Sequence, residues 1–203
     1  MSRTKTLRDY LTRDYLCPYA AVGVTSGATV FLDFDWTSSR EREVGRALLR
    51  LSRDRSAGAG AALVLVAGKD APDEPTLRRT TERVLRLLWQ VTLRAHVPSA
   101  RMSEVAEEAD RMVKETLSNA PLRPFLTVLG QPLFLVTLGA SYPERHTRHA
   151  PHDCWVLTRV SEVAETARRQ PAGVAAIRTR IVERMGELYD ADEPLLPDAA
   201  MRR

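Results

Sequence analysis

The feature that most constrains the fold of this chain is an unbroken apolar run at residues 61–67, Ala-Ala-Leu-Val-Leu-Val-Ala. A strand without a polar face has to be covered on both sides, because either face would otherwise present apolar side chains to water. A glycine-containing stretch at 56–60 precedes the run, and a loop at 68–75 with two prolines follows it. The run therefore predicts a strand of a sheet that carries other elements on both faces.

Further apolar stretches predict the other strands. Residues 21–24 and 28–34 flank a Thr-Ser-Gly turn, and residues 125–129 and 133–138 flank Gly-Gln-Pro. Each pair has the pattern of two strands around a short turn, so two hairpins are predicted. A last strand is predicted at 155–158.

Amphipathic stretches predict the helices. Residues 1–16 form an N-terminal arm or helix, and 190–203 form an irregular tail. Apolar residues at helical spacing predict further helices at 38–53, 76–95, 101–118 (with Met102 on the inward side), 161–169 and from 171 onward. Hairpins followed by helices favour a single α+β domain over 1–203, with a mixed or mostly antiparallel sheet covered by helices. A nucleotide-binding α/β fold is disfavoured, because no glycine-rich turn follows the first strand.

The charge balance narrows the expected partners. The chain has 30 Lys and Arg residues against 26 Asp and Glu, a formal net charge of +4. Acidic residues are interspersed among the arginines, whereas nucleic-acid binding needs a concentrated basic face, so we expect no nucleic-acid partner. No apolar run approaches the roughly 18 residues of a membrane span, and no apolar signal segment follows the basic start. We therefore expect a cytoplasmic protein with no membrane partner, in which the only two cysteines, Cys17 and Cys154, stay reduced.

Three of the four histidines lie in one connection between predicted strands, at His146, His149 and His152. Imidazoles on a loop between rigid strands favour a metal or haem site, and a solvated basic turn is the other interpretation. A zinc site made of His149, His152 and Cys154 lacks a fourth ligand. A cysteine hydrolase that pairs Cys17 with one of these histidines stays open, whereas no Gly-x-Ser-x-Gly motif supports a serine hydrolase.

Five short motifs follow one another in a characteristic order along the chain. They are Cys17-Pro18-Tyr19, Leu87-Leu88-Trp89-Gln90, Gly130-x-Pro132-Leu133-Phe134-Leu135, the loop Tyr142-Pro143…His146-x-Arg148-His149-Ala150-Pro151, and Ile177-Arg178-x-Arg180-Ile181. In this order they resemble the YqcI/YcgG family, over residues 17–197.

The resemblance implies haem chemistry. Characterised members of that family are haem-dependent N-oxygenases, which use O2 to hydroxylate a nitrogen, notably in the guanidine group of arginine or its relatives, in natural-product pathways. The resemblance implies haem b with His146 as the axial ligand and Cys17 as its rival. Arg145 and Arg148 would pair with the propionates, and His149 stands where the family commonly has an aromatic residue. Electrons would come from an external donor protein or reductant.

A guanidine- or amine-bearing substrate would need a carboxylate clamp, for which Asp33, Asp35 and Glu144 are the candidates. Trp155 and Trp36 are candidates for the wall of the haem pocket. A non-catalytic haem-binding sensor or carrier and a peroxidase-like haem oxidoreductase are the alternatives. The oligomeric state stays open, with a homodimer as one option.

Overall fold

The computed structural model describes residues 2–15, 23–53, 61–97, 101–119, 125–142, 148–159 and 161. Within them the elements are α1 (Arg3–Arg13), β1 (Thr29–Phe34), α3 (Ser38–Arg53), β2 (Ala62–Ala67), α4 (Glu74–His96), α5 (Met102–Asn119), β3 (Phe125–Val128), β4 (Gln131–Leu138) and β5 (Cys154–Arg159). The helices predicted from 161 and 171 and the tail at 190–203 lie outside the described residues, apart from Ser161. None of the described helices is long and apolar enough to cross a membrane.

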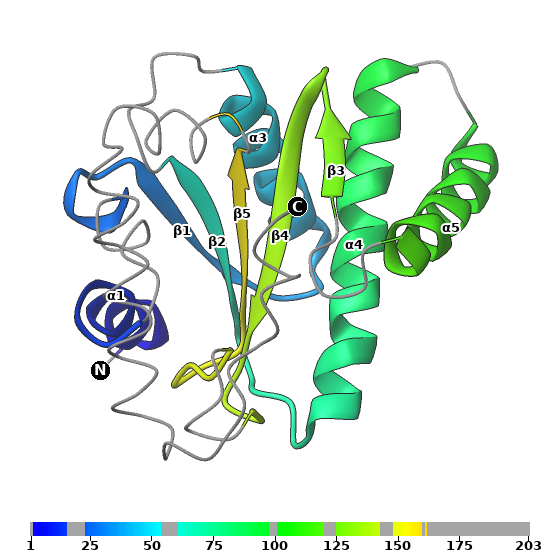
Figure 1. The fold of residues 1–203 in the computed structure, drawn as a ribbon. Helices are drawn as coiled ribbons and strands as arrows, with labels where there is room; N and C mark the ends of the chain where they lie inside the picture. The colour runs from blue at the N-terminus through cyan, green and yellow to red at the C-terminus, as the bar shows by residue number, and fades with distance from the viewer. Residues whose placement is uncertain are drawn as a thin grey trace.

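The strands form one five-stranded sheet in the order β1-β2-β5-β4-β3. β1 runs parallel to β2, and every other neighbouring pair is antiparallel. Helices cover this mixed sheet on both sides, with α1 on one face and α3 and α4 on the other (Figure 1). The predicted α+β fold with a mixed sheet is therefore confirmed.

The central strand β2 behaves as its sequence predicts, because all of its residues are buried. Leu63 and Leu65 join the core beneath α3 and α4, whereas Val64 and Val66 pack with Leu7 and other residues of α1. Alternate side chains of one strand thus enter two separate hydrophobic clusters. The apolar run requires both helical layers, and the fold supplies both.

The first predicted hairpin does not form among the described residues. Residues 23–25 form a helical turn, β1 pairs with β2, and residues 21 and 22 of the predicted strand lie outside the described residues. The turn itself is present, since Gly27 has a φ of +74°. β1 pairs with a strand far along the chain, which places Leu32 beside Leu65 in the sheet.

The second predicted hairpin is confirmed, with its turn shifted by one residue. β3 and β4 pair on either side of Leu129 and Gly130, whose φ angles are 50° and 76°. Two consecutive residues with positive φ give a turn whose twist matches that of the strands. Gln131 and Pro132 consequently belong to β4 rather than to the turn.

The helices α3, α4 and α5 match their predicted ranges closely, with two differences. α4 begins at Glu74, because the Asp73 side chain accepts a hydrogen bond from the Thr76 N–H (2.7 Å) and caps the helix. Met102 was predicted to face inward, but it is 66% exposed. Met102 is the first residue of α5, a helix that packs mainly on α4, and its buried residues begin one turn later at Val105.

Candidate functional site

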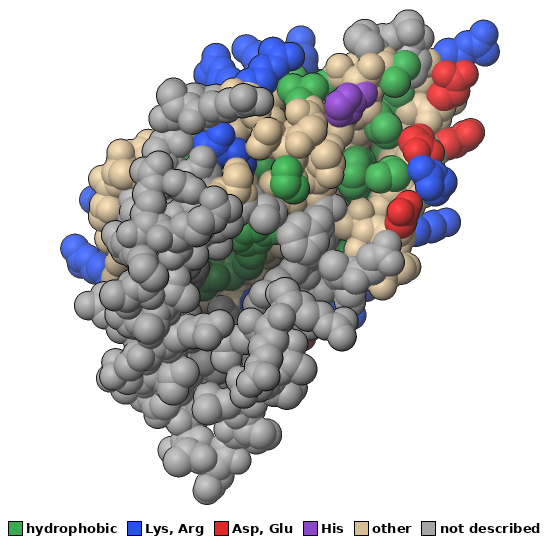
Figure 2. All heavy atoms as spheres, turned by 45° about the horizontal axis from the view of Figure 1, so that its top comes forward, with side chains coloured by type: hydrophobic (Ala, Val, Ile, Leu, Met, Phe, Trp, Pro, Cys, Tyr) green, Lys and Arg blue, Asp and Glu red, His purple; other side chains and the backbone are tan. Residues whose placement is uncertain are grey.

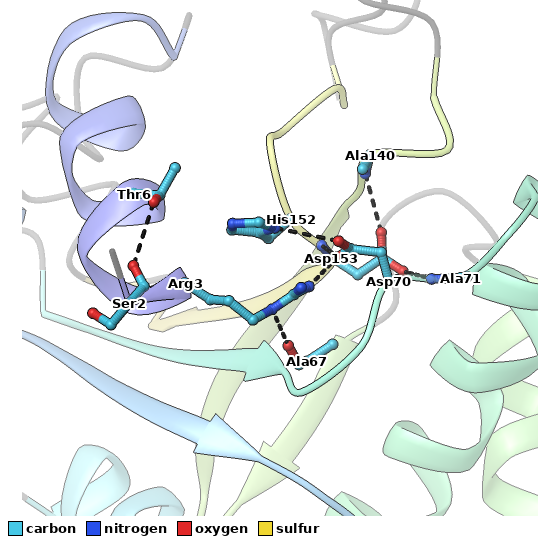
Figure 3. A network of polar contacts seen from close by, with 9 residues as sticks. All are labelled: Ser2, Arg3, Thr6, Ala67, Asp70, Ala71, Ala140, His152 and Asp153. Atoms are coloured by element: carbon cyan, nitrogen blue, oxygen red, sulfur yellow. Dashed lines mark hydrogen bonds and ion pairs between the residues drawn. The ribbon is translucent and has the colours of Figure 1, made fainter.

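Several charged and polar side chains lie close together at one edge of the sheet, formed by the ends of its strands. The carboxyl ends of β1, β2 and β4 meet the amino end of β5 at this edge. The loop after β2, the connection from β4 to β5 and the first turn of α1 converge there, as Figure 3 shows. They bring together Arg3, Asp70, His152 and Asp153, which we call the edge cluster.

Asp70 is the centre of the edge cluster. Its carboxylate forms an ion pair with Arg3 and accepts a hydrogen bond from the Asp153 N–H (2.8 Å). His152 Nδ1 lies 3.2 Å from the other carboxylate oxygen. Partial burial by itself would raise the pKa of Asp70, but the Asp153 N–H, Arg3 and His152 together outweigh it and leave the pKa below its ordinary value. Asp70 is therefore ionised at neutral pH.

The Arg3 guanidinium is held from two sides. One of its terminal nitrogens contacts Asp70, and its Nε donates a hydrogen bond to the Ala67 carbonyl at 2.8 Å. Arg3 is the first residue of α1, and Ala67 is the last residue of β2. The edge cluster thus contains a binding place for a guanidinium group, which the chain's own arginine occupies.

Asp153 forms hydrogen bonds with the loops that surround the guanidinium group of Arg3. Its side chain is only 2% exposed and accepts hydrogen bonds from the N–H groups of Ala71 (2.6 Å) and Ala140 (3.0 Å), while its carbonyl accepts one from the Ala67 N–H (2.9 Å). Burial raises the pKa of Asp153, and the nearby charge of Asp70 raises it further, against the effect of the two N–H donors. Two neighbouring carboxyl groups therefore have pKa values shifted in opposite directions, an arrangement common where acid and base roles are divided.

Gly139 allows the backbone to lie very close to the side chains of Asp153 and Leu77. A side chain at Gly139 would place its Cβ 2.6 Å from Asp153 Oδ1 and closer still to a methyl group of Leu77. No ordinary Cβ contact is that short. Residue 139 can therefore lie this close to Asp153 and Leu77 without displacing either side chain only because it is glycine.

Two histidines of the predicted histidine loop lie at this edge with the same orientation. Nδ1 of His149 is 2.9 Å from the Tyr142 carbonyl, and Nδ1 of His152 faces the Asp70 carboxylate. Carbonyl and carboxylate oxygens can only accept, so Nδ1 carries the proton in both rings. In the neutral form Nε2 then has the free lone pair, which is how histidines that ligate metals are oriented.

The structure places the other predicted site residues as follows. Cys17, Glu144, Arg145 and His146 lie outside the described residues. Arg148 precedes His149 at the sheet edge, where its carbonyl accepts a hydrogen bond from the Gly139 N–H (3.0 Å).

Asp33 and Asp35 both have local partners. Asp33 is exposed and accepts a hydrogen bond from the Thr4 hydroxyl (2.5 Å) on α1. Asp35 follows β1 and accepts hydrogen bonds from the hydroxyl and the N–H of Thr37 just before α3, which lower the pKa of Asp35. The partners of these two carboxylates are thus Thr4 and Thr37, neither of which belongs to the edge cluster, and the edge cluster contains carboxylates of its own.

The two tryptophans have different surroundings. Trp155 is 1% exposed in the core, and its Nε1 donates a hydrogen bond to the Thr81 hydroxyl on α4 (2.9 Å). Trp36 is 38% exposed and lies under the Arg83 guanidinium, 4.0 Å from the ring centre. Trp155 joins the cluster beneath α3 and α4, whereas its neighbour Cys154 packs on the α1 side.

Cys154 is a buried free thiol. Burial raises the pKa of this thiol strongly, so it stays protonated at neutral pH. Within the described residues no group of three or more His, Cys, Asp or Glu side chains could hold a metal ion. The zinc interpretation through His149, His152 and Cys154 gains no support there.

Sequence reasoning missed Arg3, Asp70 and Asp153. A usable signal existed for the two carboxylates, because Asp70 follows the buried run and Asp153 immediately precedes the last strand. Polar residues just beyond the ends of strands often meet at one edge of a sheet. No local signal pointed to Arg3, whose partners lie more than 60 positions away.

Comparisons of the chain with protein-family models, with curated proteins and with solved structures found no match.

Proposed function

We propose that this chain is a haem-dependent oxygenase of the YqcI/YcgG type that hydroxylates a nitrogen of a small guanidine- or amine-bearing substrate, using O2, in a natural-product pathway. The observation that carries the proposal is that Asp70 and the Ala67 carbonyl, beside His152, form a binding site for a guanidinium group. The order of sequence motifs supplies the link to haem.

The chemistry of the edge cluster suits a guanidinium substrate. A carboxylate that stays ionised at neutral pH forms a charge-assisted pair with a guanidinium, and a carbonyl next to it accepts a further N–H. Asp70 and Ala67 provide this combination for Arg3. A substrate guanidinium would occupy this place after exchange with Arg3, or would bind beside it against the same carboxylates.

Two histidines at this edge of the sheet have a ring nitrogen that is suited to bind iron. His149 and His152 both have Nδ1 engaged by an oxygen acceptor, which leaves Nε2 to ligate or to accept a proton. The family resemblance favours His146, with Cys17 as its rival, and both lie outside the described residues. Haem, when bound, would supply the activation of O2, with electrons from an external donor.

The chain's own residues would bind and orient the substrate. Asp70 would hold the guanidinium charge, and Asp153 would keep the loops around it fixed through its two N–H partners. His152 Nε2 would be placed to accept or return a proton at the substrate nitrogen. The proposal includes a cytoplasmic protein, where the free thiol of Cys154 stays reduced.

Turnover of the haem-loaded protein tests the proposal. O2 consumption and product mass would be followed with arginine, agmatine and simple amines in the presence of a reductant. We expect a product that is one oxygen atom heavier, and a KM that rises in Asp70→Asn but not in the matched variant Asp33→Asn. Haem binding without conversion of any guanidine or amine would contradict the enzyme and leave a sensor or carrier.

A further inference from the structure

A cleft lies at the opposite end of the sheet from the edge cluster. It has a volume of about 610 Å³ and runs between the edge strand β1 and the helix α3. Its lining includes Val30, Leu32, Arg46, Arg50, Leu51 and Leu63. Most of the strand residues in the lining stand at the amino ends of β1 and β2, whereas the edge cluster follows the carboxyl end of β2.

The interior of the cleft is apolar. Val30 and Leu32 point to the side of the sheet that α3 covers, and Leu51 and Leu63 continue the same surface. Val30 is nevertheless 50% exposed, because α3 leaves this part of β1 uncovered in the described structure. The volume of the cleft lies within the range of about 300–1,000 Å³ found for small-molecule sites, which are lined mostly by apolar side chains.

The α3 side of the cleft carries two cations. Arg46 and Arg50 are four residues apart on α3, so they lie on the same face of the helix. Neither has a hydrogen bond or ion pair within the part of the chain that the structure describes. The one acid in the lining, Glu43, is already paired with Arg40 at 2.7 Å. Figure 2, in which the top of Figure 1 comes forward, shows Lys and Arg side chains grouped at the upper rim of this face, next to hydrophobic side chains.

We infer that this cleft binds a free amphipathic carboxylate, a molecule with one carboxylate and an unbranched or compact apolar body. The apolar lining would take the body, and the two guanidinium groups would grip the carboxylate, which their planar geometry matches in a bidentate way. A cationic or neutral ligand would leave both arginines without a partner. The inference is independent of the proposed function, because the two sites share no residue.

Calorimetric titration of the full chain with octanoate, below its micelle concentration, tests the inference. We expect saturable binding of one octanoate per chain, weakened about tenfold or more in Arg46→Gln/Arg50→Gln, since loss of a charge-assisted contact costs that much. The matched control is Arg78→Gln on α4, an exposed arginine that pairs with Glu74 and does not line the cleft. Val30→Trp, which fills the cleft, should also abolish binding, and thermal melting confirms that each variant is folded.

Four outcomes would overturn the inference. Wild-type protein that binds no octanoate would show that the cleft is not a site, and equal affinity in the double arginine variant would show that the cations take no part. Octyltrimethylammonium or octyl phosphate that binds as tightly as octanoate would exclude a carboxylate-specific site. Haem that displaces octanoate would show that the cleft is the haem site rather than a second one.

Discussion

Replacement of Asp153 should reveal how much the edge cluster contributes to stability. Its two carboxylate oxygens accept separate hydrogen bonds, one from the Ala71 N–H (2.6 Å) and one from the Ala140 N–H (3.0 Å). Asp153→Ala removes both acceptors, and each backbone N–H left without a partner costs about 1–3 kcal/mol. Because Ala140 is exposed and water can reach its N–H, the lower part of that range applies to it. We expect a loss of about 2–4 kcal/mol in the free energy of unfolding.

Asp153→Asn provides the internal comparison. The asparagine keeps one oxygen acceptor and turns an NH2 group toward the other N–H, so about half of the loss, about 1–2 kcal/mol, should result. Urea unfolding followed by far-ultraviolet circular dichroism measures both values. The control is Asp33→Asn, an exposed carboxylate with a single hydroxyl partner, which should change stability by less than about 0.5 kcal/mol. An Asp153→Ala protein as stable as wild type would refute the assigned role of this carboxylate.

Further predictions concern the same edge and the core beside it. Gly139→Ala should destabilise the fold by about 1–3 kcal/mol, because its Cβ would overlap Asp153 and Leu77, and a melting temperature equal to wild type would contradict this. The pKa of Asp70 lies below its ordinary 3.8, so the stability from its ionised form is full above pH 3.8 and is lost as the pH falls through the lowered pKa. Asp70→Asn should therefore lose less stability than wild type on acidification below pH 3.8, and parallel curves in urea unfolding would argue against it. Trp155→Phe should cost about 1–2 kcal/mol by chemical unfolding, since the buried Thr81 hydroxyl loses its indole donor; a neutral result would mean that water replaces that donor.

Local patterns in the sequence predict much of this fold. The run 61–67 predicts a strand covered on both faces, and β2 is that strand. The helical spacing of 76–95 corresponds to α4 within two residues at its start and one at its end. These elements are predictable because a continuous apolar run or an apolar stripe specifies both the element and the surface that must cover it.

Strand pairing is less predictable, because it depends on partners far apart in the chain. The Thr-Ser-Gly turn before β1 suggested a hairpin, yet β1 pairs with β2 across the whole of α3. The second turn, at Leu129 and Gly130, does join two strands. The second prediction succeeded because Phe125–Val128 and Gln131–Leu138 both present apolar residues to the same core, whereas residues 23–25 form a helical turn.

The candidate site was also predicted only in part, because some of its residues are far apart in the chain. The histidine loop was noticed because its residues are adjacent in sequence, and His149 and His152 indeed lie at the sheet edge. Asp70 and Arg3 were missed because the ion pair between them spans 67 positions and depends on how α1 lies against the sheet. Asp33 and Asp35 were singled out by strand periodicity, which places side chains on a face but does not identify their partners.

The most direct test of the proposed function is a haem titration of the purified protein followed by its absorption spectrum, in the ferric, ferrous and carbon monoxide-bound states. We expect a Soret band that saturates at about one haem per chain, that is lost or shifted in His146→Ala, and that is unchanged in Cys17→Ala. The opposite pattern in the two variants would move the axial ligand to the thiolate. A protein that binds no haem in a saturable way would contradict the proposed oxygenase function. The ion pair between Arg3 and Asp70 would then have a structural role only.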